Sequence, residues 1–400
     1  MLSSAARSAG VIATFALLAQ PAADSKKPEP SVRQVGTMRT ARAAHTATTL
    51  ASGQVLLVGG MTEDGGSTAN VELLDPAQNV ISELGALAER RSGHTATLLT
   101  DGRVVIAGGY NGEYLASMEL FDSSARRFRV VGSLQEERSG HTATLLPDGR
   151  VLFVGGVGRG WTFLRSAELF DPASGRAEPL GAMSVPREGH TATLLADGRV
   201  LIIGGHNGRR RQMEVHATAE IFDPRTRRFE SAGQLATARH KHDAVRLTDG
   251  RVLVIGGADR SDRVHFATTE VYTPSNGAFE PGPSMANRRY KIAGTSILLP
   301  TGDVLVTSGA AVAELLDVDR WSFREIPGRL PAAYRFATAA LLREGDVVIA
   351  GGYSDGNRNT AGVWRYGRPG APSGVPRPES TGETRGWTLP YKALSASPPG

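Results

Sequence analysis

One stretch of sequence returns seven times along the chain, and it limits the possible folds more than any other feature. It resembles His-Thr-Ala-Thr-Leu-Leu-x-Asp-Gly-Arg-Val-Leu-x-x-Gly-Gly, and its clearest copy runs from His190 to Gly205. The other copies begin at His45, His94, His141 and His242, with degenerate copies at Gly294 and Ala337. The Gly-Gly pairs of the five clear copies are 47 to 52 residues apart. A period of about 50 residues suits a four-stranded blade better than a helical repeat.

Each unit has the pattern of four short strands, here called a to d. In the fourth unit, residues 191–195 form strand a, and the Asp197-Gly198 pair predicts a tight hairpin turn. The apolar run 199–203 is strand b, which its composition predicts to be covered on both faces. Residues 219–224 and 229–233 supply strands c and d. Turn signals every 8–12 residues or so, with no long helical period, predict an all-β protein.

The Gly-Gly pair after an apolar strand, the Glu-Leu-Phe-Asp-Pro-like strand c and the repeat length resemble kelch repeats. The resemblance covers residues 31–366. It implies a seven-bladed kelch-type β-propeller with four antiparallel strands in each blade. It does not imply one function, because kelch propellers include enzymes, peptide-binding modules and scaffolds.

The two ends of the repeat region predict how the ring closes. The seventh unit supplies strands a, b and c over residues 338–342, 346–352 and 361–366, but no strand d follows. Residues 32–38 have the strand d pattern. We therefore expect the N-terminal strand to complete the last blade, which removes exposed sheet edges.

The segments outside the repeats predict an exported protein. Residues 1–23 resemble a signal peptide, because Arg7 precedes an apolar run at 11–19 that is too short to span a bilayer. Residues 24–30 are interpreted as a linker, and the Pro/Gly/Ser-rich tail 367–400 is expected to be disordered. The chain has no cysteine, so it has no lipid-anchoring cysteine. We predict a secreted or periplasmic protein without a transmembrane anchor, and a monomer.

The charge pattern narrows the class of partner. The net charge is +5, and dense basic clusters occur only at Arg209-Arg210-Arg211 and at residues 225–228. The aromatic interleaving typical of single-stranded nucleic-acid binding is missing, so nucleic acid is not expected as a partner. A protein or a glycan, including a negatively charged sugar, fits an exported propeller better.

The topology of a blade predicts which face binds. The d–a connections and the b–c loops lie on one face, while short, repetitive turns lie on the other. The b–c loops vary in length, and the loops of blades 4 and 5 are long. Variable loops on a rigid frame are where binding is usually found. We therefore expect the site on the d–a and b–c face, in the sector of blades 4 and 5.

The repeated polar residues have a structural and a functional interpretation. An arginine precedes each motif histidine by three positions, and strand c carries a glutamate in six blades. Blade 6 keeps a cation, interpreted as Lys291, and Glu314; blade 7 has Tyr334 and Gly362 in the two places. The joint loss predicts a buried Arg–Glu pair within each blade. The histidines either satisfy backbone groups or form a polar ring for an anion or sugar.

Four histidines lie outside the motif, all in blades 4 and 5. His206, His216 and His265 are candidate metal ligands, but no tight spacing supports a metal site, and none is predicted. The framework also resembles galactose oxidase, in which a Tyr-His pair at the motif position supplies copper ligands. Here Gly140 precedes His141, and the cysteine of the radical cofactor is absent. No cofactor is therefore predicted.

The sequence favours a protein- or glycan-binding module over an enzyme. The alternative is a carbohydrate-acting enzyme, similar to the periplasmic kelch mutarotases that act on acidic sugars. An enzyme predicts a deep pocket with a histidine or carboxylate of perturbed pKa, whereas a module predicts a flat, arginine-rimmed face. No catalytic residue is assigned. The candidate ligand-binding residues are His45, His94, His141, His190, His242, His206, Arg209, Arg210, Arg211, His216, His240 and His265.

Overall fold

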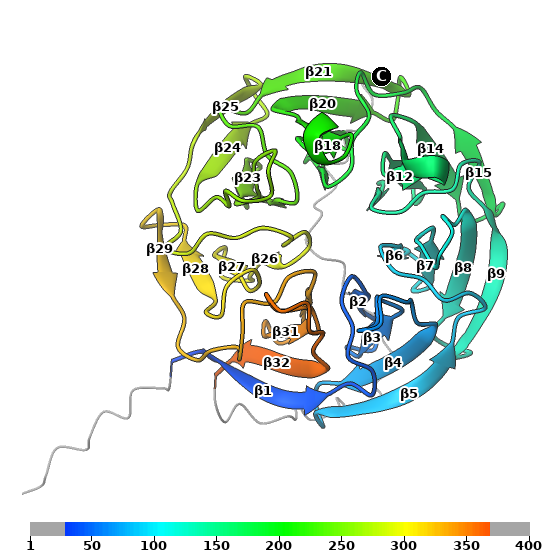
Figure 1. Cartoon of the computed structure of the whole chain (residues 1–400), viewed down its shortest axis with the longest axis vertical. Helices are drawn as coiled ribbons and strands as arrows, with labels where there is room; N and C mark the ends of the chain where they lie inside the picture. Colours follow the sequence, from blue (N-terminus) through cyan, green and yellow to red (C-terminus); the bar gives the residue numbers. More distant parts are fainter. Residues whose placement is uncertain (1–28, 369–400) are drawn as a thin grey trace, which may run out of the picture.

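The chain folds into a ring of seven four-stranded antiparallel sheets (Figure 1). The computed structural model describes residues 29–368, without the side chain of Arg210. The all-β, seven-bladed fold expected from the repeats is confirmed. The predicted signal peptide and nearly all of the predicted linker and tail lie outside the described residues. Among the described residues, no helix is long and apolar enough to cross a membrane.

Blades 1 to 6 each contain four consecutive ring strands. In the order a to d, blades 1 to 3 are formed by β2 (Thr46–Thr49), β3 (Val55–Val58), β4 (Asn70–Asp75), β5 (Val80–Ala86); β6 (Thr95–Leu98), β7 (Val104–Ala107), β8 (Ser117–Asp122), β9 (Arg127–Ser133); and β10 (Thr142–Leu145), β11 (Val151–Val154), β14 (Ala167–Asp171), β15 (Arg176–Pro179). Blades 4 to 6 are formed by β16 (Thr191–Leu194), β17 (Val200–Ile203), β20 (Thr218–Asp223), β21 (Arg228–Gln234); β22 (Asp243–Arg246), β23 (Val252–Ile255), β24 (Thr269–Thr273), β25 (Ala278–Pro281); and β26 (Ser296–Leu298), β27 (Val304–Val306), β28 (Glu314–Asp317), β29 (Ser322–Glu325).

Blade 7 joins the two ends of the described chain. Its strands are β30 (Thr338–Leu341), β31 (Val347–Ala350), β32 (Gly362–Gly367) and the N-terminal β1 (Ser31–Thr37). β1 pairs antiparallel with β32, with Val32 opposite Tyr366. The blue and red ends of the ribbon therefore lie side by side in Figure 1. The predicted closure by the N-terminal strand is confirmed.

The hydrophobic core lies between blades. All four residues of β17 are buried, as the apolar run of strand b predicts. One core cluster joins Leu152 and Val154 of blade 3 to Val200, Ile202 and Phe222 of blade 4. An equivalent cluster fills each of the other blade interfaces. Because each sheet buries its faces against two neighbours, the ring forms a rigid frame for the loops.

Two b–c loops contain short hairpins that the sequence patterns did not reveal. In blade 3, β12 (Val157–Gly158) pairs with β13 (Thr162–Phe163) around the 3-10 turn η1 (Arg159–Trp161). In blade 4, β18 (His206–Asn207) pairs with β19 (Glu214–Val215), and η2 (Arg210–Gln212) lies between them.

Six blades contain a fully buried Arg–Glu pair. The clearest example joins Arg138 Nη2 to Glu168 Oε1 at 2.7 Å. The equivalent pairs are Arg42–Glu72, Arg91–Glu119, Arg187–Glu220, Arg239–Glu270 and Arg289–Glu314. Each arginine also donates to the carbonyl of the first residue of the Gly-Gly pair or its equivalent, for example Arg138 Nη1 to Gly155 O at 2.9 Å. The pair therefore links a d–a connection to strands b and c of the blade.

Two details of the sequence interpretation are wrong. In blade 6 the paired cation is Arg289, not Lys291, because two additional residues (293–294) separate the motif from strand a, and Ile292 occupies the histidine place. In blade 7 the residue in the glutamate place is Trp364, opposite Ile349, rather than Gly362. Tyr334 packs against Trp364 with ring centroids 5.3 Å apart. An aromatic pair thus replaces the ion pair, as a well-packed apolar substitute can.

Candidate functional site

The five motif histidines join neighbouring blades. Each is buried, and its Nε2 lies 3.0–3.2 Å from the hydroxyl of a strand a threonine in the preceding blade, as His141 does with Thr95. Burial lowers the pKa of every one of them, to about 3 for His94 and His190. They are therefore neutral at physiological pH. A direct contact with ligand stays a prediction for these five, and their burial argues against it.

Asp243 takes over this joining role where blade 6 lacks the histidine. It occupies the threonine place of blade 5 and accepts hydrogen bonds from three backbone N–H groups of blade 6. The donors are Gly294, Thr295 and Ser296, at 2.7–3.1 Å. Blade 6 is thus still hydrogen-bonded to blade 5.

The residue before each motif histidine, or its equivalent, lies in a backbone ring around the axis. These seven residues all have positive φ, between 49° and 65°: Ala44, Gly93, Gly140, Gly189, Lys241, Lys291 and Phe336. Six of them donate a backbone N–H to the carbonyl of the equivalent residue in the preceding blade, at 2.7–3.1 Å. The ring fixes the point from which each side chain starts.

The side chains of this ring differ sharply between the two halves of the propeller. The two residues between the motif arginine and histidine are Ala43-Ala44, Ser92-Gly93 and Ser139-Gly140 in blades 1 to 3. The equivalent pairs in blades 4 to 7 are Glu188-Gly189, His240-Lys241, Tyr290-Lys291 and Arg335-Phe336. One half is therefore lined by small residues, and the other carries acid, base, cation and aromatic groups.

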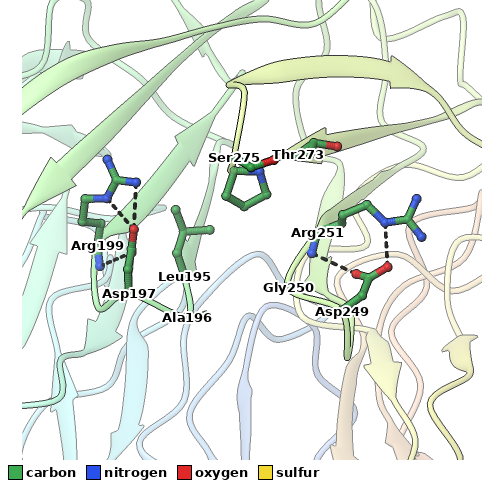
Figure 2. A pocket seen from close by; sticks show the side chains of 10 residues that line it. Leu195, Ala196, Asp197, Arg199, Asp249, Gly250, Arg251, Thr273 and Ser275 are labelled. Atoms are coloured by element: carbon green, nitrogen blue, oxygen red, sulfur yellow. Dashed lines mark hydrogen bonds and ion pairs between the residues drawn. The ribbon is translucent and has the colours of Figure 1, made fainter. Parts of the chain in front are cut away.

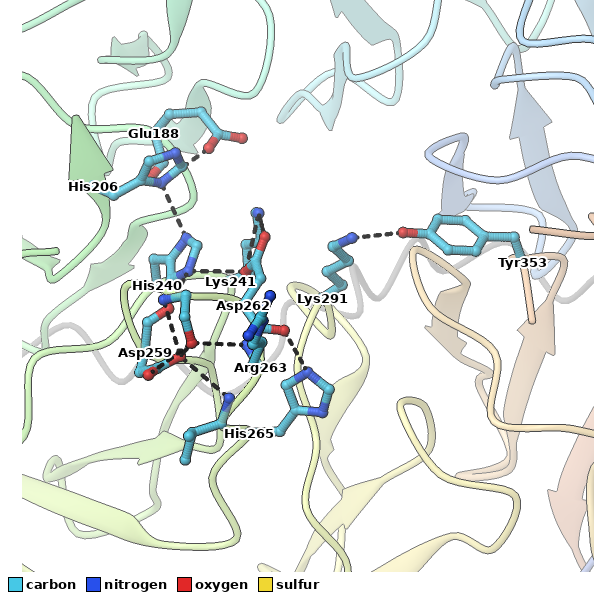
Figure 3. Close-up of polar contacts among 12 residues, drawn as sticks. Glu188, His206, His240, Lys241, Asp259, Asp262, Arg263, His265, Lys291 and Tyr353 are labelled. Atoms are coloured by element: carbon cyan, nitrogen blue, oxygen red, sulfur yellow. Dashed lines mark hydrogen bonds and ion pairs between the residues drawn. The ribbon is translucent and has the colours of Figure 1, made fainter. Parts of the chain in front are cut away.

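Seven residues of the second half form what we call the axial cluster: Glu188, His206, His240, Lys241, Asp262, Lys291 and Tyr353 (Figure 3). Small residues of the ring make room for two of them. A Cβ atom on Gly140 would lie 2.9 Å from Glu188 Oε1, and one on Gly189 would lie 3.1 Å from Lys241 Cγ. Glycine at these two positions therefore positions the Glu188 carboxylate and the Lys241 stem.

A chain of close polar contacts connects the members from blades 4 and 5. His206 Nδ1 lies 3.2 Å from Glu188 Oε2 and 3.1 Å from His240 Nδ1. His240 Nε2 lies 3.1 Å from Asp262 Oδ1, and Lys241 Nζ donates to Asp262 Oδ2 at 3.0 Å. The four groups from Glu188 to Asp262 therefore form one continuous chain of polar contacts.

The surroundings shift the pKa values of this chain in opposite directions. Burial raises the pKa of Glu188, although the ammonium of Lys241 partly opposes the shift, and the side chain is still 22% exposed. Burial lowers the pKa of His206 to about 3, helped by His240 and Lys241. Burial alone would raise the pKa of Asp262, but the hydrogen bond from His240 and the charge of Lys241 outweigh it and hold the pKa well below its usual value.

Lys291 is a partly buried cation without a carboxylate partner among the described residues. Its Nζ donates to Tyr353 Oη at 2.7 Å and lies 5.1–5.5 Å from the ring centres of Tyr290, Phe336 and Tyr353. Burial lowers its pKa, and the nearby charge of Lys241 lowers it further. An ammonium has three donors, so two remain available to water or a ligand.

The structure brings only some of the sequence candidates together. His206 and His240 join the axial cluster. His265 stacks on Tyr290 at 3.7 Å, while the buried His216 contacts the carbonyl of Pro186. His206, His216 and His265 thus have separate partners, and within residues 29–368 no group of three or more suitable side chains is arranged to hold a metal ion.

The arginine cluster of blade 4 lies in the b–c loop. Arg209 places its guanidinium 3.5 Å from the ring centre of Trp161, and Arg211 is exposed. The carbonyl of Arg211 accepts a hydrogen bond from Arg260 in the b–c loop of blade 5. The side chain of Arg210 lies outside the described part of the molecule.

Two concave regions between blades 4 and 5 lie on opposite faces. A groove of about 560 Å³ lies between their b–c loops and includes Glu214, Asp259, Arg260 and Phe266. The other, of about 380 Å³, lies on the face of the a–b turns (Figure 2). There the pairs Asp197–Arg199 and Asp249–Arg251 are closed within their own turns. The second region is therefore a by-product of a repeated turn rather than a place where unpaired groups converge.

The fold and this cluster define the molecule as a seven-bladed β-propeller with an asymmetric polar centre on its d–a and b–c face. No family model matches the chain, and no curated protein matches it. Among solved structures it is similar to a fungal alcohol oxidase of the AA5 family in complex with copper. The TM-score is 0.65 at 16% identity, over 86% of this chain and 77% of that one. At this identity the likeness shows the fold alone.

The residues present do not fit the radical copper centre that a galactose-oxidase-like framework implies. The chain has no cysteine to form the crosslinked cofactor. The motif histidines are buried against threonines, and the residues before them are Ala44, Gly93, Gly140, Gly189 and Lys241, none of them a tyrosine.

Sequence reasoning missed Glu188, Lys241, Lys291, Asp262 and Tyr353. It concentrated on the arginine and histidine positions, which repeat, and passed over the two residues between them, which vary. A comparison of those two positions across the seven copies would have found the first three. Tyr353 directly follows the Gly-Gly pair, in the same place as His206, so a comparison of that position would have found it as well. Asp262 lies further along the b–c loop of blade 5, where no repeated position marks it.

Proposed function

We propose that the protein binds an anionic glycan through the axial cluster and the b–c loops on the same face. The observation that carries the proposal is the ammonium of Lys291, a partly buried cation with donors to spare and no carboxylate partner among the described residues. A bound carboxylate would supply the missing charge and accept these hydrogen bonds, and charge-assisted hydrogen bonds of this kind are among the stronger ones.

The surroundings of Lys291 favour a sugar acid over a simple anion. The cluster adds two carboxylates, two imidazoles and a phenol, which together donate and accept the hydrogen bonds that sugar hydroxyl groups need. Exposed arginines at the rim support an anionic ligand, because none of them forms an ion pair with a described carboxylate: Arg211, Arg260 and Arg263. Such a rim steers anions toward the face.

Two expectations from the sequence belong to the same proposal. The kelch resemblance includes exported proteins that act on acidic sugars, and the signal-like segment 1–23 supports export to the periplasm or beyond the cell. A protein partner is the other ligand class that the sequence leaves open.

The test uses two sugars that differ in one group. Isothermal titration with galacturonate and with neutral galactose should give binding of the acid only. Lys291→Met should weaken galacturonate binding by about 10- to 100-fold, as expected for loss of a hydrogen bond to a charged group. Arg251→Gln, on the opposite face, is the matched control and should bind normally. Equal binding of both sugars, or an unaffected Lys291→Met variant, would refute the proposal.

A second candidate function is an enzyme that exchanges the anomers of an acidic sugar. The observation that favours it is Glu188, whose pKa is raised by burial while its side chain remains partly exposed beside His206. Ring opening needs one group to remove the proton of the anomeric hydroxyl group and another to protonate the ring oxygen as its bond to the anomeric carbon breaks. Perturbed carboxyl and imidazole groups serve such steps. No cofactor is required.

Nuclear magnetic resonance exchange spectroscopy of galacturonate can separate the enzyme from the binding module. An enzyme should accelerate α/β exchange above the buffer rate, and Glu188→Gln should abolish the acceleration while galacturonate still binds. If the wild-type protein binds galacturonate but does not accelerate its α/β exchange, the enzyme hypothesis is rejected for this substrate and the binding-module hypothesis is kept.

A further inference from the structure

An aromatic cluster lies on the b–c loops of blades 2, 3 and 4. Tyr110 and Tyr114 have ring centroids 5.1 Å apart, and Tyr114 meets Trp161 edge-to-face at 6.0 Å. Arg209 completes the cluster by stacking on Trp161. Large apolar side chains are seldom left this exposed without a reason, yet Trp161 is 50% exposed and Tyr110 37% exposed.

The backbone of the blade 3 hairpin holds the indole in an unusual conformation. Trp161 has a φ of 66°, in the left-handed region that bulky residues rarely adopt, and Gly160 before it has the same φ. The pairing of β12 with β13 and the stacked Arg209 maintain this conformation. Residues held in this way occur preferentially at binding sites.

The same hairpin is in contact with the axial cluster. Phe163, two residues after Trp161, packs edge-to-face on His206 with ring centroids 5.4 Å apart. Burial raises the pKa of Tyr114 to about 12; Arg209 opposes this shift and Glu188 adds to it. The Tyr114 phenol therefore lies within the electrostatic reach of both groups, and the two sites adjoin.

We propose that Tyr110, Tyr114, Trp161 and Arg209 form a second subsite, which takes a uronic acid residue of an acidic oligosaccharide whose neighbouring residue occupies the axial cluster. This inference rests on the proposed glycan function and extends it from one sugar to a chain. The C–H face of a pyranose ring packs on the exposed aromatic surface. Stacking on Trp161 fixes the orientation of the planar Arg209 guanidinium, whose edge donates two parallel hydrogen bonds to the sugar carboxylate.

The charges of the two sites favour a polyuronate over a neutral glycan. Lys291 and Arg209 are both cations without an ion-pair partner among the described residues, and they belong to adjoining sites. A linear chain of uronic acids offers a carboxylate on every residue, so consecutive residues meet both cations. A neutral chain gains only the aromatic contact.

The experiment compares chain lengths in matched variants. Dissociation constants of galacturonate and tetragalacturonate are measured by titration calorimetry for the wild type, Trp161→Ala, Arg209→Gln and the opposite-face control Arg251→Gln. The wild type and control should bind the tetramer at least about 10-fold more tightly than the monomer. Trp161→Ala and Arg209→Gln should each remove most of this gain and leave monomer binding unchanged. Neutral cellotetraose should show no comparable gain.

The outcomes separate this inference from the proposed function. A tetramer-to-monomer ratio that stays at the wild-type value in Trp161→Ala would overturn the second subsite. Absence of monomer binding, with tetramer binding that depends on Trp161, would overturn the axial site and keep the subsite. No binding of either sugar would overturn both, and point to a protein partner instead. Trp161→Phe distinguishes loss of the aromatic contact from a local folding defect, because an aromatic ring at this position should retain part of the higher affinity for the tetramer.

Discussion

The buried pair of Arg138 and Glu168 allows a quantitative test of what holds a blade together. Both side chains are almost completely buried, and their atoms meet at 2.7 Å. Arg138→Ala would leave the Glu168 carboxylate without its cation and the carbonyl of Gly155 without its donor. Removing one partner of a buried pair costs about 3–5 kcal/mol. With an unfolding entropy typical of the described 340 residues, a loss of about 4 kcal/mol lowers the Tm by about 6 °C.

The assay is thermal unfolding followed by circular dichroism, with a control from the same blade. Arg150 forms an equally short ion pair with Asp148, but that pair lies on an exposed turn. Arg150→Ala should therefore cost less than about 1 kcal/mol. The double variant Arg138→Leu/Glu168→Leu should be more stable than Arg138→Ala, because it leaves no unpaired buried charge. An Arg138→Ala Tm within 1 °C or so of the control would refute this account of the pair.

Three further predictions concern the ring as a whole. Deletion of residues 1–38 should lower the Tm markedly and increase aggregation in size-exclusion chromatography, because it exposes the edge of β32. An unchanged Tm would contradict closure of the ring by β1. Asp243→Asn should lower the Tm by about 3 °C, because it weakens acceptance of three backbone donors, whereas Asp249→Asn on an exposed turn should not. The free energy of unfolding should fall as pH falls from 6.5 toward 3, because the histidines of the unfolded chain bind protons in this range while the buried His94 and His190 stay neutral. At pH 5.5 each of these two histidines should lower the free energy of unfolding by about 1 kcal/mol. His190→Asn should therefore make the Tm depend less on pH between 6.5 and 5.

The repeat predicted the ring, its closure and the Arg–Glu pairs because these features depend on what every blade shares. It misplaced two partners where single blades depart from the pattern. The two additional residues 293–294 moved Lys291 out of the cation place, and an aromatic pair replaced the charges around Trp364. Neither change alters the apolar runs and turn signals on which the strand prediction rested.

The axial cluster was predicted only in part, for a different reason. His206 and His240 were candidates because they are histidines outside the motif. Glu188 and Lys291 were missed because their significance depends on the ring that brings blades 4 to 7 around one axis. The contacts of Trp161 likewise depend on a hairpin whose two-residue strands are too short to leave a periodic pattern.

The left-handed ring around the axis also has a consequence for protein engineering. Gly93, Gly140 and Gly189 adopt this conformation freely, whereas Ala44, Lys241, Lys291 and Phe336 adopt it at an energetic cost of about 1 kcal/mol each. A screen for thermostable variants would therefore favour glycine at these four positions. At Lys241 and Lys291 the same substitution would remove a group of the axial cluster, so selection for heat resistance would weaken ligand binding.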